Sequence, residues 1–130
     1  MKTFEELIRE LKSSDLAIRD KAALDLMDIG NDNAVPPLIE AIRNPDNVDY
    51  RGTLVYSLSA YNCVDHLEYL VELCLTGNFE VSSNAFNIFE EIEPTQTTTS
   101  KIKVQLEKHN LDNLPYEHSL EAYKALSQLL

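Results

Sequence analysis

The chain has 130 residues, of which 44% are hydrophobic, and 22 acidic against 11 basic residues give it a formal net charge of −11. This length and composition fit a single domain over residues 1–130 and exclude a disordered tail or a membrane protein. The negative charge opposes binding to nucleic acid or to an anionic membrane, and it favours a basic protein partner.

Apolar residues recur at helical spacing almost throughout, and only three glycines interrupt them. The pattern therefore predicts an all-α protein of about eight helices. We expect these helices near residues 3–12, 16–29, 34–43, 48–61, 65–76, 80–92, 100–109 and 116–129. Thr3 is the expected cap of the first helix, and Gly30 and Gly77 are the expected C-terminal caps of two others.

Two adjacent prolines, Pro36 and Pro37, precede an apolar helical stretch. Proline is tolerated in the first turn of a helix, where backbone N–H groups have no partner within the helix. We therefore expect Asn33 to cap this helix and the prolines to start it. The polar segment "EPTQTTTS" (93–100) is expected to be a mobile loop, because it is β-branched and marked by proline.

The chain repeats itself at an offset of 31 to 32 residues, except that the second helix of the third copy follows after 35 residues because of a longer loop. The repeats cover about 14–44, 45–77 and 78–109, with capping helices at 3–12 and 116–129. Arg19 aligns with Arg51 and then with Ser82. The first helices of the repeats share four apolar positions: Ala22, Leu54 and Ala85; Ala23, Val55 and Phe86; Leu26, Leu58 and Phe89; Ile29, Tyr61 and Ile92. The second helices align Val35 with Leu67, Leu38 with Leu70, Ile39 with Val71 and Ile42 with Cys74, and the third copy has Ile102, Leu106 and His109.

The segment "SDLAIRDKAALDLMDIGNDNAVPPLIEAI" resembles a HEAT-like repeat of the type found in phycobilisome lyases. Its opening arginine, Ala-Ala core, Ile-Gly ending and Ala-Val-Pro start carry the likeness, which is strongest over 14–44 and weakest over 78–109. The resemblance implies a right-handed α-α superhelix, that is, a HEAT-like solenoid. It implies little about function, since this repeat serves enzymes, scaffolds and inhibitors alike.

No catalytic, cofactor-binding or metal-binding constellation stands out. The three histidines are scattered, no His-Glu dipeptide of the HEAT-like iron hydroxylases occurs, and the glycines form no phosphate-binding loop. Cys63 and Cys74 are expected to be buried, reduced thiols of a cytoplasmic protein. Arg19 and Arg51 are expected to be structural, bonded to acidic neighbours between repeats.

Exposed positions indicate where a partner would bind. In HEAT-type solenoids the second helices line the concave surface, and an exposed tyrosine among carboxylates suits a basic partner. The concave candidates are Glu40, Asp65, Tyr69 and Glu72. The convex alternatives, on the first helices, are Leu24, Asp25, Asp28 and Tyr56.

These features predict a non-enzymatic protein-binding module, and more specifically an acidic immunity protein that neutralises a basic bacterial toxin by direct binding. Two alternatives stay open. One is a lyase-type enzyme or enzyme subunit, as the resemblance implies. The other is a structural adaptor that dimerises through the C-terminal "ALSQLL".

Overall fold

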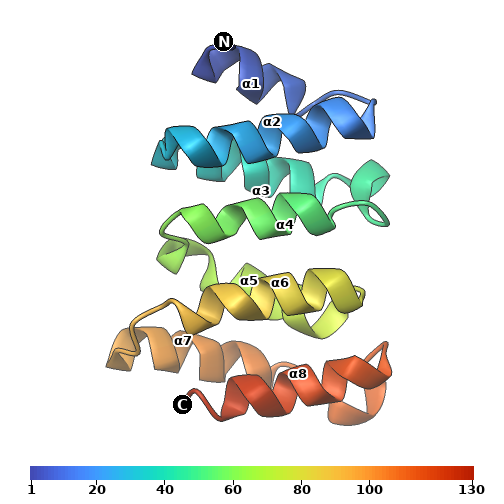
Figure 1. The fold of residues 1–130 in the computed structure, drawn as a ribbon. Coiled ribbons are helices and arrows are strands. Elements are labelled where there is room, and N and C mark those ends of the chain that lie inside the picture. The colour runs from blue at the N-terminus through green and yellow to red at the C-terminus, as the bar shows by residue number, and fades with distance from the viewer. The chain divides into compact units, whose positions relative to one another are not determined.

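A computed structural model describes residues 1–130 and contains eight α-helices, five short 3₁₀ turns and no strand (Figure 1). The predicted all-α class is confirmed. The chain divides into two compact units, residues 1–62 and residues 63–130, and each is described by itself.

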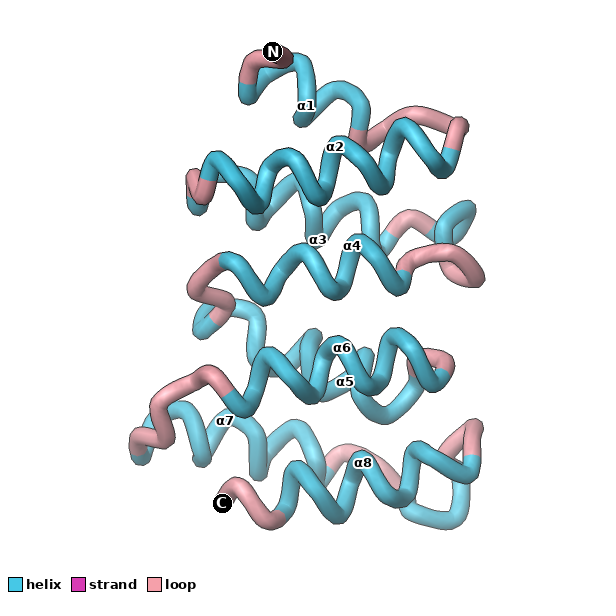
Figure 2. The backbone as a smooth tube through the Cα atoms, viewed as in Figure 1, coloured by secondary structure: helices cyan, strands magenta, loops and turns pink.

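The first unit contains four α-helices. They are α1 (Phe4–Glu10), α2 (Leu16–Ile29), α3 (Val35–Arg43) and α4 (Gly52–Ser57). Within this unit α2 and α4 pack side by side, and α3 lies behind them in the view of Figure 2. Their facing sides bury a core that includes Ala22, Leu26, Leu38, Ile42, Leu54 and Leu58.

The second unit also contains four α-helices. They are α5 (Leu67–Thr76), α6 (Phe79–Glu90), α7 (Gln96–Glu107) and α8 (Glu117–Ser127). Helix α5 contacts each of the other three, and six of its ten residues are buried. Helices α6 and α8 are also in contact, and Figure 2 shows them in front of α5 and α7.

Helix α3 begins with the two prolines in its first turn, as predicted. The predicted Asn33 cap is wrong, because residues 32–34 form a 3₁₀ turn that Asn31 caps through its side chain. The Asn31 Oδ1 accepts a hydrogen bond from the Asn33 N–H at 2.9 Å. The side-chain cap is therefore Asn31, two residues before the predicted position. Ala34, which directly precedes α3, provides no side-chain cap.

Helix α4 is shorter than the predicted helix 48–61. Residues 45–47 form a separate 3₁₀ turn started by Pro45, and residues 58–60 tighten into another 3₁₀ turn. The Ser57 hydroxyl donates to the Leu54 carbonyl at 2.7 Å, a local bond that competes with regular helical pairing. The expected 14-residue helix is therefore only six α-helical residues long.

The segment 93–100 is not the open loop that its composition predicted. Helix α7 starts at Gln96, and Thr95 and Thr98 cap it reciprocally: the Thr95 Oγ1 accepts from the Thr98 N–H, and the Thr98 Oγ1 from the Thr95 N–H. Thr98 is buried. Threonine side chains at the cap satisfy the backbone groups that start a helix, so the β-branched run is compatible with a helical turn here.

The two glycines end their helices in different ways. Gly30 adopts φ 68°, the left-handed conformation that favours glycine, and its N–H donates to the Leu26 carbonyl. Gly77 follows α5 in an extended conformation with φ −75°. A Cβ added at Gly77 would lie 2.4 Å from the Val81 Cγ1, so close packing of α6 requires glycine at this position.

Most aligned apolar positions of the repeats are buried, including Leu26, Leu58 and Phe89 at one shared position. Four expected core residues are not buried. Ile29 is exposed, and Phe86, Ile92 and His109 are half-buried, the last of them beside a carboxylate. Ile29, Ile92 and His109 lie at or just past the last residue of their helices, where the chain leaves the packed helix face.

Candidate functional site

Arg19 is the largest side chain without exposed surface, and it lies in α2. Its Nε and Nη2 donate to the Asp20 Oδ1 at 3.0 and 2.7 Å, and its Nη2 also donates to the Tyr50 carbonyl. The Nη1 has no hydrogen-bond partner. Tyr50 belongs to the next repeat, so Arg19 joins two repeats within the first unit. The predicted structural role of Arg19 is confirmed.

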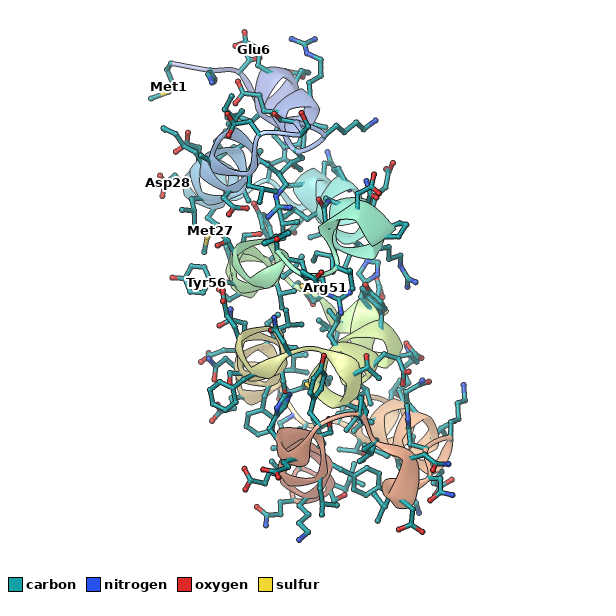
Figure 3. All side chains as sticks on the ribbon, turned by 90° about the vertical axis from the view of Figure 1, so that its right-hand side faces the viewer. Met1, Glu6, Met27, Asp28, Arg51 and Tyr56 are labelled. Carbon is teal, nitrogen blue, oxygen red and sulfur yellow. The ribbon has the colours of Figure 1, made fainter.

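Arg51, the aligned arginine, is half-buried at the start of α4. Figure 3 shows its side chain on the opposite side of the first unit from Tyr56. Its Nε is buried without a hydrogen-bond partner. No acidic neighbour pairs with it as Asp20 pairs with Arg19, so the predicted ladder holds for the first arginine only.

The outer face of α2 and α4 carries the residues predicted as convex candidates. Leu24 is 42% exposed, Tyr56 is 50% exposed, and Asp28 is exposed. Figure 3 shows Asp28 and Tyr56 pointing outward on the same side of this unit. Asp25 is partly neutralised, since it accepts from the Lys21 Nζ at 2.8 Å, and this hydrogen bond raises the pKa of Lys21. The face thus presents an aromatic ring, an aliphatic side chain and one unpaired carboxylate.

The residues predicted as concave candidates occupy less uniform surroundings. Glu40 on α3 and Asp65 in the 3₁₀ turn 64–66 are exposed. Tyr69 and Glu72 on α5 are both half-buried. Glu40 belongs to the first unit and the other three to the second, so the four are described within their own units only.

Glu72 is held by Gln105 of α7 and by His109, which lies two residues past the end of α7. The Gln105 Nε2 donates to its Oε2 at 2.8 Å, and the His109 Nε2 lies 2.5 Å from the same oxygen. Because a carboxylate only accepts, the His109 Nε2 carries a proton in this pair. Glu72 therefore ties α5 to α7, a role that the sequence did not reveal because 33 and 37 residues separate it from its partners.

An aromatic cluster of the second unit was missed by sequence reasoning. Phe79 starts α6 and is 69% exposed, while Tyr116 and His118 flank the start of α8. The His118 ring stacks on Tyr116 with centroids 4.8 Å apart and meets Phe79 edge-on at 5.7 Å. In the sequence, the only signal was a phenylalanine directly after Asn78, a residue suited to cap a helix. The ring partners of Phe79 lie almost forty residues further along the chain.

Both cysteines are buried free thiols, and burial raises the pKa of Cys74 far above its ordinary value. No cluster of three or more histidine, cysteine or carboxylate side chains is arranged to hold a metal ion. None of the helices combines the length and the apolar character needed to cross a membrane.

Comparison of the chain with models of known protein families, with curated proteins and with solved structures finds no match. The HEAT-like resemblance therefore remains a prediction that only the internal repeat of the sequence supports.

Proposed function

We propose that this protein is a non-enzymatic binding module for a basic protein partner, and that the outer face of α2 and α4 contacts this partner. The observation that carries the proposal is the half-exposed Tyr56 ring with the unpaired carboxylate of Asp28 on the same side, together with the exposed side chain of Leu24 on α2. Tyrosine is a favoured interface anchor because it buries a large area at little cost in conformational entropy. The surrounding negative charge would speed encounter with a basic partner.

The row of concave candidates, Glu40, Asp65, Tyr69 and Glu72, contributes less to this proposal. Glu72 is already bonded to Gln105 and His109, and Tyr69 is half-buried, so neither offers the free surface that Tyr56 offers. Glu40 and Asp65 are exposed carboxylates that would steer the approach of a partner. A partner on this row would have to break existing contacts of α5.

The specific form that we propose is an acidic immunity protein that neutralises a basic bacterial toxin in the cytoplasm. The net charge of −11 supports a basic partner, and two buried free thiols suit a reducing compartment. We also propose that residues 14–44, 45–77 and 78–109 are HEAT-like repeats. The offset of 31 to 32 residues between the first helices of the repeats and the Arg19 bond to the following repeat support this arrangement.

Affinity capture from the native organism tests the proposal, with the captured protein then titrated by calorimetry at increasing salt. We expect a basic protein whose affinity falls as salt rises and weakens about 30-fold or more in Tyr56→Ala, the usual loss at a hot spot. Tyr50→Ala is the matched control, because Tyr50 is an exposed tyrosine of the same unit and its hydrogen bonds to Arg19 and Asn47 are made by its backbone, which the substitution keeps.

Two results would contradict the proposal. If Tyr56→Ala binds normally and Tyr69→Ala does not, the partner uses the α5 row. If the affinity is insensitive to salt, the charge serves solubility rather than recognition.

A further inference from the structure

A shallow groove runs between α6 and α8 in the second unit. Each helix lines it with four residues at the i, i+3, i+4, i+7 spacing of one helix face, and Asn87 completes it. The lining residues of the two helices are Phe79, Ser82, Ser83 and Phe86 of α6, and His118, Glu121, Ala122 and Ala125 of α8. The lining combines small side chains with the rings of Phe79, Phe86 and His118.

The size of the groove decides between classes of ligand. Its volume is about 240 Å³, below the roughly 300–1,000 Å³ typical of small-molecule sites. This is the volume that about eight water molecules occupy in the liquid, and it is enough for one or two long side chains of a peptide. The groove therefore fits side chains presented by another protein better than a free metabolite.

The aromatic end of the groove is rigid. The His118 Nε2 lies 2.9 Å from the Gly77 carbonyl oxygen, and since a carbonyl only accepts, this nitrogen carries the proton. The bond anchors the imidazole to the end of α5, between the stacked Tyr116 ring and the edge-on Phe79 ring. Phe79 keeps 69% of its surface exposed despite this contact, so an aromatic surface is available without rearrangement.

The charge of the groove selects the chemistry of its occupant. Helices α6 and α8 together carry four glutamates and a single lysine, and Glu121 is the one carboxylate in the groove lining. No lysine or arginine lines it. A cation over an exposed aromatic ring and a carboxylate beside it are the two contacts that a guanidinium group makes best.

We propose that the α6–α8 groove binds an arginine-bearing segment of a partner protein, with the guanidinium group between Phe79 and Glu121. The aliphatic stem of the arginine lies along Phe86 and the two alanines of α8 that line the groove, as long cationic side chains do on apolar surfaces. Arginine is favoured over lysine because its planar, weakly hydrated group both stacks and forms paired hydrogen bonds. This site is separate from the α2–α4 face, and either can fail without the other.

The test is a titration of the whole isotope-labelled protein, followed by nuclear magnetic resonance, with the acetylated peptide Ala-Arg-Ala-Ala-Arg-Ala. We expect shifts of the backbone amides to concentrate on Phe79, Ser83 and Glu121, and the lysine version of the peptide to bind more weakly. Phe79→Ala and Glu121→Gln should each weaken binding about two- to fivefold, as expected for single exposed cation–π and ionic contacts.

Matched controls separate this site from general attraction to an acidic protein. Val104 is 55% exposed and Glu107 is exposed, both on α7 outside the groove, so Val104→Ala and Glu107→Gln should bind the peptide as the natural chain does. The proposal is overturned if the peptide fails to bind at millimolar concentration, or if all four variants weaken binding equally. It is also overturned if a leucine-containing peptide without arginine binds better, since the groove would then take an apolar helix.

Discussion

The two units solve the same packing problem with different chemistry. At one aligned position of the repeat, the first unit buries Arg19, which reaches a backbone carbonyl of the following repeat. The second unit buries Ser82 at this position, and its hydroxyl donates to the Cys74 carbonyl at the end of α5 at 2.7 Å. Both side chains supply a hydrogen-bond donor to a carbonyl that would otherwise be unpaired. The first and third copies of the repeat therefore share a buried donor at this position rather than a residue type, whereas Arg51 of the second copy is half-buried and its Nε has no partner.

The two units also differ in charge and in thiol content. Each contains eleven acidic residues, but the first has seven basic residues and the second only four. Their net charges are thus −4 and −7, and both cysteines lie in the second unit. The second unit is accordingly the more strongly acidic of the two, and its groove is the one that fits a cationic side chain.

The apolar core provides the largest expected effect, and it should be the same in the two units. Leu58 and Phe89 occupy one position of the repeat, and both are buried. Replacing either with alanine removes packed atoms and leaves a cavity, so each change should lower the free energy of unfolding by about 2–5 kcal/mol. Urea denaturation measures this loss. Val104→Ala is the control, and a loss below about 0.5 kcal/mol at Leu58 or Phe89 would contradict the repeat alignment.

Removing the buried donor should destabilise the protein more in the first unit than in the second. Arg19→Ala removes three hydrogen bonds and a large side chain, and should cost about 2–3 kcal/mol, because Asp20 is partly exposed and recovers solvation. Ser82→Ala only leaves the Cys74 carbonyl unpaired, at a cost of about 1–2 kcal/mol.

Arg19→Met provides a sharper form of this experiment. It fills a similar volume without the charge, so it avoids the cavity that alanine leaves, while Asp20 is partly exposed and recovers solvation. We expect the urea concentration at the midpoint of unfolding to be clearly higher for Arg19→Met than for Arg19→Ala. Equal losses in the two variants would show that the bond to the Tyr50 carbonyl matters more than packing.

The sequence predicted most helices because amphipathic spacing and helix-terminal residues are local signals. Gly30 and the prolines of α3 lie where these signals placed them. The errors have local causes too. Asn31 and Asn33 are both suitable N-cap residues, and the sequence alone does not say which of them caps the turn. Thr95 and Thr98 form a capping box without the usual acidic partner.

The candidate sites were harder to predict because they depend on contacts distant in the chain. In the sequence Glu72 looks like a free carboxylate on α5. In the fold, His109 just past the end of α7 lies against it. The Phe79 ring meets His118 only because α6 and α8 pack together. A single sequence without such pairings predicts which side chains face outward, and not which of them are already engaged.

The smallest expected effect concerns alkaline pH and belongs to the second unit alone. Burial of the Cys74 thiol raises its pKa from the ordinary value of 9.0, so the folded chain keeps a proton that the unfolded chain loses. The unfolded state then binds fewer protons above pH 9, and the free energy of unfolding must fall as pH rises through that value. At pH 10 this group alone should remove about 1 kcal/mol of stability relative to pH 8.

Cys74→Ala isolates this contribution, since the other alkaline groups remain. The variant starts from a lower stability because it loses packing in α5, but its decline between pH 8 and pH 10 should be shallower by about 1 kcal/mol. Urea denaturation at several pH values measures both curves. Parallel curves for the two proteins would mean that the thiol titrates in the folded state as it does in water, which would require solvent to reach the end of α5. In that case Ser82, whose hydroxyl bonds the Cys74 carbonyl, would also be accessible to solvent, and the equivalence between Ser82 and the fully buried Arg19 would fail.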